Sequence, residues 1–204
     1  TGGFLITAMN HALKELHNNE VKLWGNPNSP TNYELEELYR KRTEYLSSYV
    51  FGLDLNPALI RAAKMNMVMN NDGAGGLFRE NSLANPHTWE QETVKSISLG
   101  SFDLVFTNPP FGANILIDDV NILSQYELAA VWDSGETGKL TIRRDKSGEP
   151  VLQTNQPPEI LFIERCVHLL KPGNGKMAMV IPNGILNNPS LCYVRNWLLH
   201  NVQL

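Results

Sequence analysis

Apolar positions follow two different spacings along this chain. Short apolar runs bounded by turn residues predict strands at 49–54, 76–83 (with its exit), 102–106 and 176–182. Between them, apolar residues recur at helical spacing and predict helices at 4–16, 33–47, 58–71, 159–170 and 190–200. Strands that alternate with helices are typical of an α/β fold with a doubly wound, mainly parallel sheet. Ligands bind to such sheets at the carboxyl ends of the strands.

The strand expected at 102–106 ends abruptly in Asn108-Pro109-Pro110-Phe111. Pro110 forces Pro109 out of the helical region, and neither proline has an N–H to give to a sheet. The chain must therefore leave the strand in a stiff, extended turn directly after Asn108.

This turn has a chemical consequence for an amino group on a flat ring. The Asn108 amide oxygen and the Pro109 carbonyl oxygen are two neighbouring acceptors, and the Phe111 ring lies a step away. Two acceptors take the two hydrogens of an NH2 group and localise its lone pair on nitrogen, while the aromatic face stacks on the ring. The alternative is an ordinary Asn-Pro turn with Phe111 plugging the core.

A second strand end carries a carboxylate. Asp54 ends the 49–54 run, and Asn56-Pro57 then opens a helix. In doubly wound nucleotide-binding sheets, an acidic residue at this place accepts hydrogen bonds from ribose hydroxyls. The alternative role for Asp54 is to cap the helix that follows it. The methionines of that helix are interpreted as core packing.

Composition bounds the class of protein. A chain of 204 residues with 42% hydrophobic and 19% charged residues is large enough for one domain with a sizeable core. The formal charge of −4 argues against gripping nucleic acid by bulk electrostatics, so part of any DNA grip is expected from a partner. The two cysteines are too few for a disulfide framework or a zinc site, and we expect no metal. No apolar run is long enough to cross a membrane, and a reduced cytoplasmic setting is expected.

Taken in order, these motifs resemble a known family. Asn108-Pro109-Pro110-Phe111 after an apolar strand is similar to the catalytic motif of amino-group methyltransferases that use S-adenosylmethionine. The surrounding chain resembles N6-adenine DNA methyltransferases of restriction-modification systems, in particular the modification subunits of type I systems. Pro182-Asn183-Gly184-Ile185-Leu186 matches the type I pattern. The resemblance is weakest between 113 and 157.

The resemblance implies a Rossmann-like methyltransferase core and assigns roles. Thr1-Gly2-Gly3 resembles the end of a glycine-rich cofactor loop, although a flexible glycine leader is the alternative. Asn81 stands where the family commonly has an Asp that binds the cofactor's adenine, and an Asx-turn is the alternative. Cofactor contacts are therefore expected from a set spread along the chain: Thr1, Gly2, Gly3, Asp54, Asn81 and Asn108. The catalytic set is Asn108, Pro109, Pro110 and Phe111.

The stretch at about 113–157 has no clear βα rhythm and is expected to be an insertion in a single domain, 1–204. Residues 140–144 and 150–153 flank a turn-like segment and predict a hairpin. Its cations Lys139, Arg143, Arg144 and Lys146 form the most basic patch of the chain. Two roles for this patch stay open: contact with DNA phosphates, or a solvated hairpin surface. The cluster Arg40, Lys41, Arg42 is interpreted as a solvated helix face.

Together these features predict a site-specific, adenine-specific DNA methyltransferase that acts on a flipped adenine in double-stranded DNA. The expected partners are a DNA-specificity subunit and, as a further candidate, a restriction subunit, in a prokaryotic cytoplasm. Because the chain opens inside the expected cofactor loop and ends in a strand-like 201–204, it is expected to be a segment of a longer protein. The alternatives are methylation of guanine N2 in ribosomal RNA or of a protein glutamine, and a non-catalytic assembly subunit.

Overall fold

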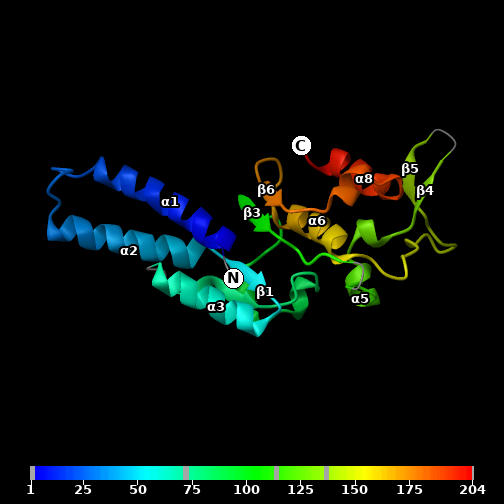
Figure 1. The fold of residues 1–204 in the computed structure, drawn as a ribbon, viewed down its shortest axis with the longest axis horizontal. Coiled ribbons are helices and arrows are strands. Elements are labelled where there is room, and N and C mark those ends of the chain that lie inside the picture. Colours follow the sequence, from blue (N-terminus) through cyan, green and yellow to red (C-terminus); the bar gives the residue numbers. More distant parts are fainter. Residues whose placement is uncertain (1–2, 71–73, 113–114, 136–137, 204) are drawn as a thin grey trace. The chain divides into compact units, whose positions relative to one another are not determined.

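The computed structural model describes residues 3–70, 74–112, 115–135 and 138–203 (Figure 1). These residues mix helices with short strands. They form two compact units. The first comprises residues 1–82 and 90–97, and the second comprises residues 83–89 and 98–204. Each unit holds one pair of parallel strands.

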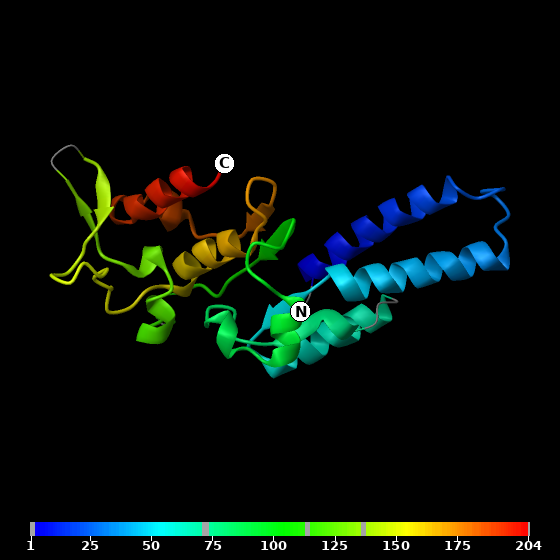
Figure 2. The same ribbon diagram turned by 180° about the vertical axis from the view of Figure 1, so that it is seen from behind.

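The first unit begins with two antiparallel helices, α1 (Gly3–Val21) and α2 (Asn32–Tyr49), which lie side by side in Figures 1 and 2. A capping box fixes the start of α2. The Thr31 hydroxyl oxygen accepts from the Glu34 amide, and the Glu34 carboxylate accepts from the Thr31 amide. Met9 and Leu13 of α1 are buried against Leu46 of α2. The helical spacing predicted for both segments is confirmed.

A β-α-β unit follows, made of β1 (Gly52–Asp54), α3 (Pro57–Met69) and β2 (Leu77–Arg79). The two strands are parallel, and Asp54 is the register partner of Arg79. The strand expected from residue 49 begins only at Gly52, because α2 continues to Tyr49. Asn71, the expected end of the helix, lies outside the described residues.

The interpretation of the α3 methionines as core was partly wrong. The buried stripe of α3 is Ile60, Ala63 and Met67. Met65 and Met69 are exposed, at 68% and 73% of their surface. Both the expected and the observed faces have helical spacing, so the pattern of apolar residues did not decide which of them faces the core.

The second unit is built on β3 (Leu104–Thr107) and β6 (Lys176–Met179), which are parallel. Helices α6 (Pro158–Leu169) and α8 (Cys192–Asn201) contribute most of the buried side chains of the core on which Met177 and Met179 pack. The short helix α7 (Asn183–Asn187) follows β6 and was not predicted. The strand-like reading of 201–204 was wrong for its described part, because α8 continues to Asn201 and Val202 caps it through the Leu198 carbonyl.

The insertion is folded, and its buried residues lie mainly in 123–130. It contains α5 (Val120–Leu123), a 3₁₀ turn (Glu127–Ala129), β4 (Trp132–Ser134) and β5 (Leu140–Ile142). The predicted hairpin is present at the Arg144–Pro150 bridge, where the Asp145 amide donates to the Glu149 carbonyl. The partner of β5 in the ladder, however, is β4. No apolar pattern in 131–134 had indicated that strand.

Two short elements lie between β2 and β3 in the chain. The connection 85–98 contains a 3₁₀ turn (Pro86–Thr88) and α4 (Gln91–Ser96). The strands described pair as β1–β2, β3–β6 and β4–β5. The mixed α/β class is thus present, and the single doubly wound sheet stays a prediction. None of the described helices is long and apolar enough to cross a membrane.

Candidate active site

The parallel ladder of the second unit ends at the residue before Asn108. Thr107 is the register partner of Met179, and its carbonyl oxygen accepts a hydrogen bond from the Val180 amide at 3.1 Å. Just before β3, the Asp103 carbonyl oxygen accepts from the Lys176 amide at 2.9 Å, and the Asp103 carboxylate binds the Lys171 ammonium at 2.8 Å. Asn108 therefore stands at the carboxyl end of a strand held at both ends. This is the edge at which α/β sheets bind ligands.

The turn after β3 buries one residue and exposes those around it. Pro109 is buried, whereas Asn108, Pro110 and Phe111 are exposed, Phe111 by 39% of its surface. Gly112 follows with φ +131°, a conformation that side chains rarely adopt. Its carbonyl accepts from the Ile115 amide at 3.2 Å. The expectation that Phe111 plugs the core is thereby excluded in this structure, and so is an Asn108 buried in hydrocarbon.

Asn108 makes no hydrogen bond to any residue in the described part of the chain. Its amide is thus available to a ligand, as is the ring of Phe111. An amide oxygen, a nearby carbonyl and an aromatic face on one stiff turn can hold a flat ring that carries an amino group.

β3 itself is less buried than the sequence predicted. Leu104 and Phe106 leave 55% and 43% of their surface exposed, whereas Val105 and Thr107 face the packed side. A run that is apolar throughout does not distinguish a strand covered on both faces from one covered on a single face.

The exit of β6 is fixed from α8. The Arg195 guanidinium donates to the carbonyl oxygens of Ile185 and Asn188 at 2.8 and 2.9 Å. The Ile185 carbonyl lies in α7, and the Asn188 carbonyl just after α7 also accepts from the Leu191 amide at 3.1 Å. Arg195 is partly buried and belongs to α8. It holds the Pro182–Leu186 stretch that the type I pattern had singled out.

In the first unit, Asp54 lies at the carboxyl end of β1 and is partly buried. One of its oxygens accepts from the Asn56 amide at 2.8 Å, and Asn56 in turn caps α3 by accepting from the Ala58 amide. The helix cap is therefore Asn56 rather than Asp54. The second carboxylate oxygen of Asp54 has no hydrogen-bond partner among the described residues, which leaves it free for a ligand hydroxyl.

The remaining predicted cofactor residues also belong to the first unit. Asn81 is partly buried and follows β2, the strand paired with β1. Because the Glu80 amide donates to the Asp54 carbonyl, the ends of the two strands that carry Asp54 and Asn81 are neighbours. Gly3 is the first residue of α1, and a Cβ placed on it would meet open space. Thr1 and Gly2 lie outside the described residues.

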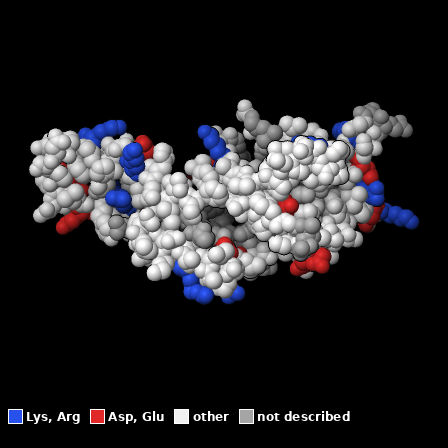
Figure 3. Space-filling view, in the orientation of Figure 1, with Lys and Arg blue, Asp and Glu red and all other residues white. Residues whose placement is uncertain are grey.

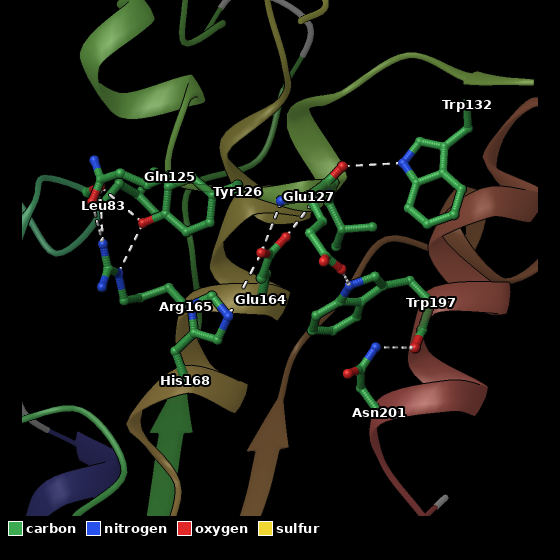
Figure 4. A network of polar contacts seen from close by, with 11 residues as sticks. Leu83, Gln125, Tyr126, Glu127, Trp132, Glu164, Arg165, His168, Trp197 and Asn201 are labelled. Atoms are coloured by element: carbon green, nitrogen blue, oxygen red, sulfur yellow. Dashed lines mark hydrogen bonds and ion pairs between the residues drawn. The ribbon is translucent and has the colours of Figure 1, made fainter. Parts of the chain in front are cut away.

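Sequence reasoning missed a buried polar network that fixes the insertion on α6 (Figure 4). The Glu164 carboxylate is 1% exposed and accepts from the backbone amides of Glu127 and Leu128 at 2.9 and 2.8 Å. Burial raises the pKa of Glu164 to about 7, and the two amide donors oppose that rise. His168 lies 3.6 Å from the same carboxylate, and its pKa is lowered, chiefly by burial.

Arg165 forms the other half of this network. Its guanidinium donates to the Tyr126 hydroxyl at 2.8 Å, to the Ala84 carbonyl at 3.0 Å and to the Gln125 side chain at 3.1 Å. Burial raises the pKa of the Tyr126 hydroxyl. The signal in the sequence was the pair Glu164-Arg165 inside an otherwise apolar helical run, since a buried charge of this kind requires partners.

The basic patch of the insertion is partly neutralised. The Arg143 guanidinium donates twice to the Asp133 carboxylate, at 2.8 and 2.6 Å, and Arg144 donates to the Gly148 carbonyl. The cluster on α2 behaves in the same way, because Arg40 pairs with Glu37 and Glu44. On the face shown in Figure 3, Lys and Arg occur in small separate groups rather than as one continuous surface.

The family model described as N-6 DNA methylase matches residues 1–191, which include every predicted site residue. A search of curated proteins finds no match.

Proposed function

The chain belongs to the N-6 DNA methylase family, a family of DNA methyltransferases, and we propose that it transfers a methyl group from S-adenosylmethionine to adenine N6 in DNA. The observation that carries the proposal is the turn after β3. It exposes the Asn108 amide and the Phe111 ring at the carboxyl end of a parallel strand. The buried Pro109 holds the backbone of this turn in place. That arrangement suits an amino-bearing ring and has no evident structural role.

The residues of this turn act on the substrate base. A stacked adenine cannot present N6 to a methyl donor, so the base leaves the helix at a cost of a few kcal/mol. Stacking on Phe111 offsets roughly 1–3 kcal/mol of that cost. The Asn108 side-chain oxygen and the Pro109 carbonyl accept the two N6 hydrogens and keep the nitrogen lone pair out of the ring. The amine so held is a nucleophile, and the proton it loses passes to solvent after transfer.

The residues of the first unit fit a nucleoside cofactor. Asp54 has one carboxylate oxygen free for ribose hydroxyls, and Asn81 follows the neighbouring strand. Gly3 begins α1 with no chain atom near its missing Cβ, so a bound group can approach this backbone closely. Thr1, Gly2 and Gly3 would take the methionine part of S-adenosylmethionine. The bound cofactor supplies an activated methyl group.

We further propose that the protein is the modification subunit of a type I restriction-modification system in a prokaryotic cytoplasm. The Pro182–Leu186 stretch supports this by its resemblance, and Arg195 fixes it in place. The formal charge of −4, and the pairing of Arg143 in the insertion with Asp133, reduce the positive charge available to DNA. Double-stranded DNA would then be read and held with a specificity subunit, with a restriction subunit as a further partner.

Labelled methyl transfer tests the proposed substrate. The protein, with and without a specificity subunit, is incubated with tritiated S-adenosylmethionine and with DNA, ribosomal RNA or a release factor. We expect label on N6-methyladenine in DNA. Label on guanine in the RNA, or on a glutamine in the protein, would replace the proposed substrate. If no substrate is labelled and calorimetry detects no cofactor binding, the chain is a non-catalytic assembly subunit.

A further inference from the structure

The turn after β3 is fixed on both of its sides. Before the turn, the Thr107 carbonyl oxygen accepts from the Val180 amide at 3.1 Å. After the turn, Ile117 and Gln156 form an antiparallel bridge, in which each backbone amide donates to the carbonyl of the other residue at 2.9 Å. The segment that carries the candidate catalytic residues therefore runs between two fixed points. The first belongs to the β3–β6 pair, and the second is Gln156.

The side chain of Gln156 fixes this second point inside the protein. Gln156 is only 2% exposed, although glutamines are mostly found at the surface. Its amide nitrogen donates to the Leu128 carbonyl and, at 2.9 Å, to the Tyr193 hydroxyl. Tyr193 belongs to α8, and its ring stacks on Trp132 with the ring centroids 6.2 Å apart. One side chain thus joins the bridge to the 3₁₀ turn of the insertion and to α8.

The 3₁₀ turn that accepts from Gln156 is itself held by two helices. The amides of Glu127 and Leu128 donate to the buried Glu164 carboxylate of α6 at 2.9 and 2.8 Å (Figure 4). The Trp197 indole of α8 donates to the Glu127 carboxylate at 2.6 Å. Moving Leu128 would break bonds to a buried charge, which is costly. Gln156 therefore links the segment after the catalytic turn to a rigid part of the second unit.

A second glutamine of the insertion has the same kind of side-chain contact without the link to the turn. Gln153 lies three residues earlier in the chain, and its amide nitrogen donates to the Ala130 carbonyl at 3.0 Å. Its backbone amide donates to the Ala129 carbonyl at 2.9 Å. Of the two glutamines, Gln156 alone is bonded to the segment after the turn, within the ranges that the structure describes. The pair therefore separates a role in folding the insertion from a role in placing the turn.

We propose that Gln156 is a positioning residue of the candidate active site. Through the Leu128 carbonyl and the Tyr193 hydroxyl, it holds Ile117, and with it the turn that presents Asn108, at a defined place on α6 and α8. A small displacement of a reacting group can lower a rate a hundredfold or so, which makes a fixed second point useful for transfer. That this placement serves methyl transfer to an amino group rests on the proposed function.

Amide hydrogen exchange tests whether Gln156 holds the segment after the turn. Gln156→Met keeps the approximate length of the side chain and removes the donor to the Leu128 carbonyl. We expect the Ile117 amide to exchange about tenfold faster or more, because the bridge opens more often. Gln153→Met is the matched control and should leave this exchange within about twofold of the wild type. Unchanged exchange of the Ile117 amide in folded Gln156→Met would overturn the proposal.

Tyr193→Phe gives a milder second variant. It removes one of the two acceptors of the Gln156 amide and keeps the ring that stacks on Trp132. We expect the Ile117 amide of this variant to exchange about three- to tenfold faster than in the wild type, as the loss of a single hydrogen bond implies. If Gln156→Met does not fold, Tyr193→Phe decides, and an Ile117 amide that exchanges as in the wild type overturns the proposal.

Methyl transfer at saturating DNA and S-adenosylmethionine tests whether this placement serves the reaction. We expect kcat of Gln156→Met to fall roughly ten- to a hundredfold. Its affinity for S-adenosylmethionine should stay unchanged, because the residues proposed to bind the cofactor belong to the first unit. Gln153→Met should retain the kcat of the wild type. An equal loss of kcat in both variants, or no loss in Gln156→Met, would overturn the positioning role.

The two measurements keep this proposal apart from the proposed function. A wild-type protein that transfers no methyl group to any of the substrates refutes the proposed function. The exchange of the Ile117 amide then still decides whether Gln156 holds the turn, because it requires neither DNA nor cofactor. Conversely, an active protein whose Ile117 amide is unaffected by Gln156→Met and by Tyr193→Phe refutes the positioning role alone.

Discussion

The Val180 amide donates to the Thr107 carbonyl oxygen at 3.1 Å, and this is the last hydrogen bond of the β3–β6 pair before the chain turns at Asn108. It fixes the peptide immediately before Asn108 on a strand that cannot shift its register without breaking the whole ladder. The turn beyond it is stiffened by two prolines. The backbone of Asn108 is therefore fixed, whereas its side chain is exposed and has no hydrogen-bond partner in the described part of the chain.

Replacing Asn108 by alanine should abolish most methyl transfer. The exposed amide makes no hydrogen bond to the residues that the structure describes, so the free energy of unfolding should change by less than about 0.5 kcal/mol. Loss of an acceptor that acts on the reacting amine should lower kcat roughly a hundredfold or more, on the scale of other preorganised polar groups. Single-turnover methylation and cofactor calorimetry measure the two effects. Turnover close to that of the wild type would remove Asn108 from the reaction.

Replacing Phe111 by alanine should weaken the hold on the flipped base. Stacking of roughly 1–3 kcal/mol per base is lost, which corresponds to a rise in KM for DNA of about five- to a hundredfold. Phe111→Trp keeps an aromatic face and is the matched control. Because the ring is 39% exposed, neither change should unfold the protein. If alanine and tryptophan give the same KM as phenylalanine, the ring does not stack on the base.

Asp54→Asn separates the structural role of this side chain from its role in binding. Asparagine retains an oxygen for the Asn56 amide, so the turn into α3 is kept. The free carboxylate oxygen is replaced by an NH2 group, which cannot accept from a ribose hydroxyl. A hydrogen bond to a charged group is worth about 1.5–3 kcal/mol, so calorimetry should show S-adenosylmethionine bound about ten- to a hundredfold more weakly. Unchanged affinity together with an unchanged melting temperature would exclude Asp54 as a cofactor residue.

Glu164 should make stability fall as pH rises. Its pKa is raised to about 7 in the folded protein, so the folded state holds this proton more tightly than the unfolded chain does. The stabilisation is full below about pH 4.5 and is lost as pH rises to about 7, by roughly 3 kcal/mol. His168 acts in the opposite sense, because its lowered pKa costs stability as pH falls below about 6.5.

Urea unfolding of the wild type and of Glu164→Gln at pH 5 and pH 8 isolates the Glu164 contribution. His168, Arg165 and Glu127 remain in both proteins, so their effects largely cancel in the difference. We expect the wild type to lose about 3 kcal/mol relative to the variant between the two pH values. Glu149→Gln should show no such difference. If the free energies of unfolding of the wild type and of Glu164→Gln differ by the same amount at pH 5 and at pH 8, the assigned pKa is wrong.

Much of the local structure followed from the sequence alone. Helical spacing predicted α1, α2, α6 and α8, because a repeated apolar stripe is a property of the segment itself. The two prolines after Asn108 determined the turn for the same reason, since they restrict the backbone wherever they occur. The motif and its strand were also sufficient to indicate the family, which the family model confirms.

Tertiary structure decided what each side chain meets. The apolar pattern of α3 allowed two stripes, and only packing selected Ile60, Ala63 and Met67. Arg195 had a helical position that suited solvent, yet it binds the carbonyls behind β6. The partners of the buried Glu164 carboxylate, the amides of Glu127 and Leu128, became visible only once distant segments were brought together. Spacing along one segment encodes its conformation, whereas burial, hydrogen-bond partners and cavities are set by segments far away in the chain.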